Sequence, residues 1–190
     1  MDERHGTTSG PDDGREGRED AATRLPTDAA WEDDVAALWA DDAVEGVERI
    51  ARMRGLAAAA PHPALGAFEL GGAFDSGGRE ADAHEQYAAA TAAGLATVDP
   101  DRAARLVVQH ASTLRNLGRV DEAIVMLRDA PLHPATGVAP RVFLALALHS
   151  AGRVDEALRV AIEAVEPTLP RYNRSVRAYA AALTGPDRPQ

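Results

Sequence analysis

The chain contains no cysteine and no lysine among its 190 residues. Without cysteine there is no disulfide framework, no thiolate metal site and no cysteine nucleophile. Without lysine there is no phosphate-binding loop of the kind that places a lysine against a nucleotide. Aromatic residues make up only 4% of the chain, and no apolar run approaches the roughly 20 residues that span a bilayer. We therefore expect neither these chemistries nor a membrane protein.

Positive charge is also scarce, and the formal net charge is −10. Nucleic-acid binding depends on many cations that neutralise phosphates, so this balance argues against a nucleic-acid partner. The first residues lack the basic and apolar segments of a secretory signal, which predicts a cytoplasmic location. The charge is unevenly distributed. Eight acidic residues and no basic one lie between Asp28 and Glu48, whereas residues 167–190 carry four arginines and one aspartate.

The ends of the chain differ in composition from its middle. Residues 1–25 are polar and rich in Gly, and with so little to bury we expect a disordered tail there, with a second short tail at 186–190. Residues 26–62 contain two amphipathic helical patterns, which are interpreted as flanking helices or a degenerate repeat. Abundant Ala and the scarcity of alternating β-branched residues favour an all-α fold.

A short motif recurs in the second half of the chain. The hexapeptide that begins at Gly118 reappears letter for letter at Gly152, 34 residues later, and a looser copy begins at Gly78. Fixed periods of this size indicate a helical repeat protein. The first two copies are 40 residues apart, so we expect a loop of about six extra residues near 97–100.

Each position of the motif has a mechanical interpretation. The glycine suits the left-handed conformation that ends a helix, and the acids after it suit the first turn of the next helix. Small residues stand five positions after and seven positions before each glycine, where two helices would cross closely. They are Ala83, Ala123, Ala157, Gly71, Ala111 and Ala145.

On these residues the chain resembles the tetratricopeptide repeat family, and more narrowly a bacterial subgroup of short proteins of undefined function. The resemblance implies a right-handed superhelix of about three helix pairs within residues 63–185, at about 63–97, 100–136 and 138–169, followed by a capping helix. The Trp typical of the first helix is replaced by Ala67, Val107 and Arg141.

The resemblance also implies a protein- or peptide-binding scaffold whose concave groove is lined by the first helix of each repeat. The positions expected to face that groove are Phe68, Asp75, Arg105, Val108, Ser112, Arg115, Asn116, Val142 and His149. Arg105 and Arg115 could hold two anionic groups of one ligand. Alternatively, each arginine pairs with a neighbouring acid. The Lys, Arg and Asn set with which some relatives bind chaperone tails is missing.

The expected capping helix spans about 170–183 and has an apolar stripe made of Tyr172, Val176, Tyr179 and Leu183. Beside it, Arg171, Arg174 and Arg177 form a basic stripe. The stripe is either solvated surface or a contact for a partner. One such partner is the acidic Asp28–Glu48 region of a second copy, which would produce a homo-oligomer.

No catalytic, metal or cofactor site is evident in the sequence. The six histidines are scattered, no serine has a glycine-flanked elbow, and neighbouring acids on a helix diverge by about 100°. His110 is interpreted as a hydrogen-bonded interior residue. A non-catalytic scaffold is the leading hypothesis, ahead of a self-assembly module and of an enzyme with an unrecognised site.

Overall fold

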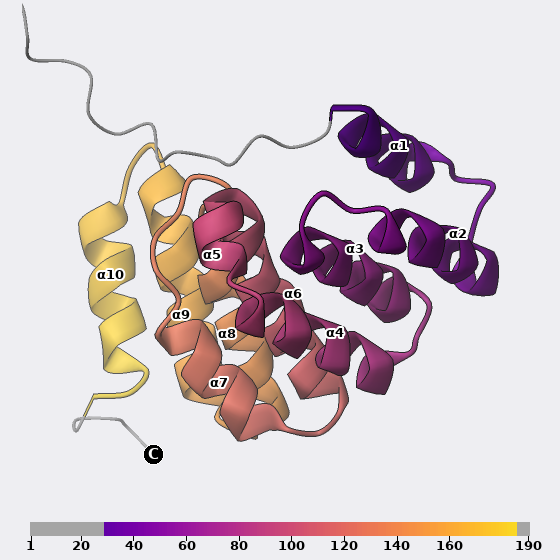
Figure 1. Ribbon diagram of the computed structural model, residues 1–190. Coiled ribbons are helices and arrows are strands. Elements are labelled where there is room, and N and C mark those ends of the chain that lie inside the picture. Colours follow the sequence, from indigo (N-terminus) through magenta and orange to yellow (C-terminus); the bar gives the residue numbers. More distant parts are fainter. Residues whose placement is uncertain (1–28, 186–190) are drawn as a thin grey trace, which may run out of the picture.

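A computed structural model describes residues 29–185 of the chain. Within this part the secondary structure is entirely helical, so the expected all-α fold is confirmed (Figure 1). The two tails expected at 1–25 and 186–190 lie outside the described residues. The helices are α1 (Ala29–Ala40), α2 (Gly46–Ala58), α3 (Pro63–Ser76), α4 (Glu80–Ala92), α5 (Leu95–Val98), α6 (Pro100–Asn116), α7 (Val120–Arg128), α8 (Ala139–Ser150), α9 (Val154–Val165) and α10 (Asn173–Ala182), with a 3-10 turn at Glu166–Thr168.

The long helices pack in chain order as a stack of pairs. Helix α3 packs on α4, α6 on α7 and α8 on α9, and successive pairs meet through α4 with α6 and α7 with α8. Helices α1 and α2 form a further pair that packs on α3, and α10 packs on α9. Figure 1 shows α1 and α2 at one end of the stack and α10 at the other. This is the arrangement of a helical repeat protein with terminal caps.

The three motif glycines end the first helix of each pair, as predicted. Gly78, Gly118 and Gly152 have φ values of 69°, 78° and 74°. At each of them the amide of the residue after the glycine donates back across the turn. Arg79 donates to the Phe74 carbonyl at 2.9 Å, and Arg119 and Arg153 repeat the bond to Leu114 and Leu148. A left-handed glycine with this bond satisfies carbonyls that a helix end leaves without partners.

The extra residues between the first two pairs form α5 rather than an irregular loop. Leu95 and Val98 of this single turn are 1% and 4% exposed. Asp99 then caps α6, because its side chain accepts a hydrogen bond from the Arg102 amide at 3.0 Å. The insertion therefore adds apolar residues to the core and fixes the start of α6.

Helix α7 is shorter than its counterparts. It has 9 residues, whereas α4 has 13 and α9 has 12, although all three begin two residues after a motif glycine. Pro131 explains the difference, because a proline disfavours helical geometry in the residue before it. The chain then runs without a regular helix until Ala139. The second pair therefore lacks the last turn of its second helix.

The buried apolar residues form two separate clusters. One extends from Trp31 to Leu106 over α1 to α6, and the other extends from Ala111 to Ala157 over α6 to α9. The boundary lies within α6 at His110, a buried polar residue. The contact between the first and second repeats is therefore partly polar.

The small residues predicted at the helix crossings are buried. Ala83 and Ala123 have no exposed surface, and Ala157 is 6% exposed. At Gly71 an added methyl carbon would stand 2.7 Å from the ring of Tyr87. Close approach of α3 to α4 thus depends on the absence of a side chain at position 71.

Replacing Gly71 with Ala is expected to lower the free energy of unfolding by about 1 kcal/mol. The clash with Tyr87 costs about 1–3 kcal/mol, and part of this is offset by the better helix propensity of Ala. Urea denaturation measures the change. Gly55 of α2 has nothing within 4 Å of an added methyl carbon, so Gly55→Ala should instead stabilise the protein by about 0.5–1 kcal/mol. Two changes of the same sign would contradict this packing.

The capping helix differs from the expectation in its start and its buried face. It begins at Asn173, so Arg171 precedes it rather than lying on it. Tyr172 and Tyr179, expected on an apolar stripe, are 75% and 74% exposed, whereas Ala180 is fully buried. The small residue lets α10 approach α9, and the two tyrosines remain at the surface.

Candidate functional site

A cavity of about 370 Å³ lies where α1, α3 and α6 meet. These are the first helices of their pairs, so the cavity lies on the side of the stack where the groove was predicted. Its walls are contributed by Glu32, Val35, Ala36 and Trp39 of α1, Phe68, Glu69 and Gly72 of α3, and Arg102, Arg105 and Gln109 of α6. We call this space the groove cavity.

Arg102 holds one wall of the groove cavity together. Its guanidinium donates to both carboxylate oxygens of Glu32, to Glu69 at 2.9 Å and to Asp99 at 3.0 Å. Trp39 donates from Nε1 to the second oxygen of Glu69 at 2.7 Å. These bonds join α1, α3 and the start of α6. We call this set the Arg102 cluster.

Three carboxylates, from Glu32, Glu69 and Asp99, surround the single cation of the Arg102 cluster. Burial by itself lowers the pKa of Arg102, but the hydrogen bond to Glu32 and the charge of Glu69 outweigh it, so the pKa is raised. The guanidinium also lies over the Trp31 ring, with 5.6 Å between the Arg102 Cζ atom and the ring centroid. The Arg102 guanidinium is therefore fully engaged in the wall and is not available to an anionic ligand.

Two other polar side chains of the cavity differ in their access to a ligand. Arg105 is exposed, and its Nε bonds to the backbone oxygen of Asp101 at 3.3 Å, while its terminal nitrogens have no partner within residues 29–185. The Oε1 atom of Gln109 also has no hydrogen-bond partner there, but this atom is buried. The cavity thus presents the open guanidinium of Arg105 beside the Trp39 ring.

The structure places the predicted groove residues in different environments. Phe68 and Arg105 line the groove cavity. Asp75 accepts a hydrogen bond from Thr113 at 2.9 Å, and Val108 is 7% exposed. On α8 both Val142 and His149 are exposed, and on α6 Ser112 is half-buried. The predicted residues are therefore spread over three helices, and their role in binding stays a prediction.

Arg105 and Arg115 do not share the groove cavity. Ten residues along a helix leave two side chains about 80° apart around its axis. Arg115 does not line the cavity, and it donates instead to the side chain of Asn116 at 3.2 Å. One ligand in this cavity would therefore meet Arg105 without Arg115.

Sequence reasoning missed most residues of this site, among them Trp39, Arg102 and Gln109. One signal was present in Glu69, which stands between Phe68 and Leu70 in a helix of mostly apolar residues. A carboxylate on a buried face needs a cation, and its position indicated that an arginine elsewhere had to reach it. The sequence does not say which arginine this is.

A polar chain occupies the boundary between the two apolar clusters. Arg119 donates from Nη1 to Nε2 of His84 at 2.7 Å, and Nδ1 of His84 lies 2.7 Å from Nε2 of His110. An arginine can only donate, so Nε2 of His84 accepts from Arg119, and Nδ1–H of His84 donates to Nε2 of His110. Burial, followed by the nearby His84 and Arg119, lowers the pKa of His110 to about 4. His110 is therefore neutral near pH 7.

The acids of the repeated motif also have structural partners. Arg119 and Arg153 each hold the glutamate three residues later with two hydrogen bonds, to Glu122 at 2.7 Å and to Glu156 at 2.6–2.7 Å. These bonds lower the pKa of both glutamates. The motif thus supplies an ion pair at the start of the second helix, in addition to the favourable dipole contact.

The predicted basic stripe is exposed at the C-terminal end of the stack. Arg171 and Arg174 are exposed, and Arg177 donates to Oε1 of Glu166 at 2.8 Å. One of the three arginines is therefore already paired within the chain.

Residues 29–185 contain no group of three or more His, Cys, Asp or Glu side chains that could hold a metal ion. No helix in this part of the chain is both long enough and apolar enough to cross a bilayer.

The stacked helix pairs and the cavity formed by their first helices define the chain as a helical repeat protein. A family model described as Tetratrico peptide repeat matches residues 64–183, which is more than half of the chain. The chain therefore belongs to the tetratricopeptide repeat family, whose members typically serve as non-catalytic scaffolds for protein interactions. The searches of curated proteins and of solved structures returned no match.

Proposed function

We propose that this protein is a scaffold that binds a peptide segment of a partner protein in the groove cavity. The observation that supports this most is the open guanidinium of Arg105 in a cavity that Trp39 and Phe68 also line. A peptide carries the complementary groups, since its acidic side chains accept hydrogen bonds and its apolar side chains pack against aromatic rings. The ligand that fits best is an extended segment with an acidic residue beside an apolar one.

Each part of such a peptide has a partner in the cavity. Its carboxylate would receive hydrogen bonds from Arg105, in the forked geometry that a guanidinium offers. An apolar side chain would lie against Trp39 and Phe68. The Arg102 cluster fixes part of the cavity wall before a ligand arrives, and a preorganised wall lowers the entropic cost of binding.

A selection from a random displayed peptide library tests this function. Peptides enriched on the full chain should contain an acidic residue next to an apolar one. An enriched peptide should bind Arg105→Glu at least about tenfold more weakly, because the change replaces a favourable contact with repulsion. Fluorescence anisotropy of the labelled peptide gives the dissociation constants.

Two matched variants make the result specific to the groove cavity. Arg115→Glu lies on the same helix outside the cavity and Arg174→Glu lies on α10, so both should bind within about twofold of the unaltered chain. No enrichment of any peptide, or equal loss in all three variants, would reject the groove cavity as the binding site.

A second function is favoured by the charges at the two ends of the stack. Exposed acids, among them Asp33, Asp34 and Asp42, occupy the α1–α2 end, and exposed Arg171 and Arg174 occupy the other end. A head-to-tail contact of these ends would assemble copies into a chain. Such assembly should weaken as salt rises from low to high concentration in sedimentation velocity. Self-association that does not respond to salt, or a monomer throughout, would exclude this electrostatic version.

A further inference from the structure

A second cavity lies on a different part of the stack, away from the groove cavity. It has a volume of about 570 Å³ and is bounded by the end of α7, the segment 129–138, the start of α8 and the end of α9. Its lining is mostly apolar, with Leu127, Ala130, Leu144, Val160 and Ala164 among its walls. Cavities of this size hold small molecules in many proteins. We call it the α7 cavity.

The short helix α7 explains why this space exists. The other second helices, α4 and α9, continue for at least three more residues after the position at which α7 stops. In those pairs the second helix thus has about one further turn. Here Pro131 ends the helix early, and the segment that follows runs around the space instead of through it. Leu132 borders this space, but it is 89% exposed, so its side chain does not fill the space.

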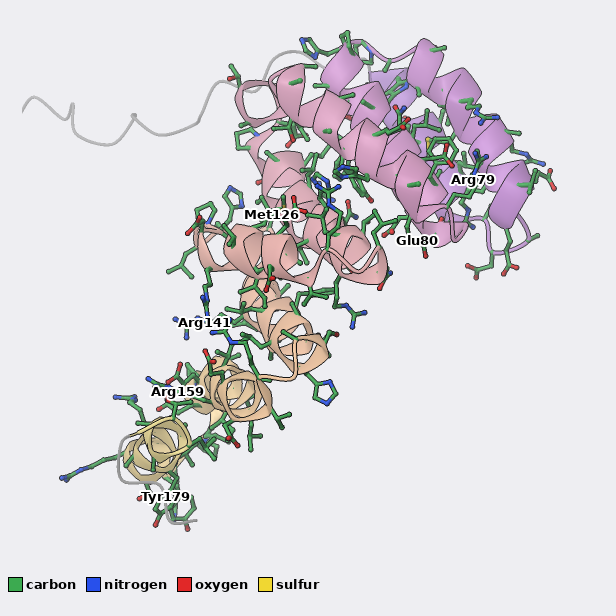
Figure 2. The ribbon with its side chains drawn as sticks, turned by 90° about the horizontal axis from the view of Figure 1, so that it is seen from below. Arg79, Glu80, Met126, Arg141, Arg159 and Tyr179 are labelled. Carbon is green, nitrogen blue, oxygen red and sulfur yellow. The ribbon has the colours of Figure 1, made fainter. Side chains whose placement is uncertain are left out.

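The rim of the α7 cavity carries one cation that remains available. Arg128 is paired with Glu156 at 3.4 Å, and Glu163 is paired with Arg159 at 2.8 Å. The guanidinium of Arg141 makes no hydrogen bond or ion pair within residues 29–185. It borders both the α7 cavity and an adjoining hollow of about 240 Å³. Figure 2 shows Arg141 along the same edge of the stack as Arg159.

We propose that the α7 cavity binds a small carboxylic acid with an apolar chain, such as a medium-chain fatty acid. The apolar walls would take the hydrocarbon chain, and Arg141 at the rim would hold the carboxylate with a charge-assisted hydrogen bond. The cavity is bounded by four segments of one chain and lined mostly by apolar side chains, which suits a narrow hydrocarbon chain better than a segment of a partner protein. This site is independent of the groove cavity.

Titration calorimetry with decanoate tests the proposal on the full chain. Decanoate should bind, and 1-decanol, which lacks the charge, should bind more weakly. Arg141→Gln should weaken decanoate about tenfold and leave 1-decanol unchanged, because only the carboxylate needs the guanidinium. Arg141 is exposed, so this change leaves the core intact.

Two further variants separate this site from the groove cavity and from general surface adsorption. Arg105→Gln should bind decanoate as the unaltered chain does. Ala130→Phe, which adds bulk at the end of α7, should abolish binding of both probes while circular dichroism shows an unchanged helix content. Absence of decanoate binding, equal affinity for Arg141→Gln, or full binding by Ala130→Phe would each overturn the proposal.

Discussion

Replacing Arg102 with methionine is expected to lower the free energy of unfolding by about 3–5 kcal/mol, the cost of breaking a buried ion pair from one side. Methionine keeps much of the stem volume but removes every hydrogen bond of the guanidinium. The side chains of Glu69 and Asp99 are only 7% and 2% exposed, so two carboxylates would remain buried without their cation. Urea denaturation followed by circular dichroism measures the loss.

Arg105→Met is the matched control, because it removes the same group three residues further along α6. Arg105 is exposed, so this change should cost no more than about 0.5 kcal/mol. Adding Glu69→Gln to Arg102→Met should recover part of the loss, since a neutral amide is less costly to bury than a carboxylate. Equal costs for the two arginine variants would mean that the Arg102 cluster does not hold α1 to the stack.

Acidification is expected to destabilise the protein through His110 by about 3 kcal/mol between pH 7 and pH 4. The pKa of His110 in the folded state is about 4, below its ordinary value of 6.5. In this window the unfolded chain binds a proton that the folded chain does not, so the free energy of unfolding decreases as the pH falls. The stability that neutral His110 contributes is fully present above pH 6.5 and is lost as the pH falls toward 4.

His110→Gln isolates this contribution. Glutamine can accept the hydrogen bond that His84 donates, but it does not titrate. The stability of the variant should therefore change less with pH. Subtracting one pH profile from the other also removes most of the contribution of Asp75, which is present in both proteins. Burial raises the pKa of Asp75, so its contribution to stability changes with pH in the opposite direction. Two parallel stability profiles between pH 7 and 4 would show that His110 is not the group responsible.

The repeat architecture could be predicted because it depends on local rules. Gly118 and Gly152 must take a left-handed conformation wherever they end a helix, and they do so whatever packs around them. The 34-residue spacing of the motif then fixes the length of each pair. The start of α10 and the burial of its tyrosines were predicted wrongly, since a terminal helix has one neighbour and its apolar pattern is a weak guide.

The candidate sites were less accessible to sequence reasoning. Arg105 lines the groove cavity because its position follows from the register of α6, and its role in binding stays a prediction. Arg102 was overlooked because its partners Glu32 and Glu69 are 70 and 33 residues away in the chain. Contacts of that separation are set by how helix pairs stack, and no local pattern encodes them. His84 and His110 are adjacent for the same reason.

The sequence alone determined the helical composition, the turn at each motif glycine and the membership in a repeat family, because each depends on neighbours a few residues apart. Only the tertiary structure decided which arginine is enclosed by carboxylates and which is left open to a ligand. It also decided that the missing last turn of α7 leaves a cavity rather than a collapsed surface. Both outcomes depend on how separate helices pack, since packing determines which charges are desolvated and which spaces remain unfilled.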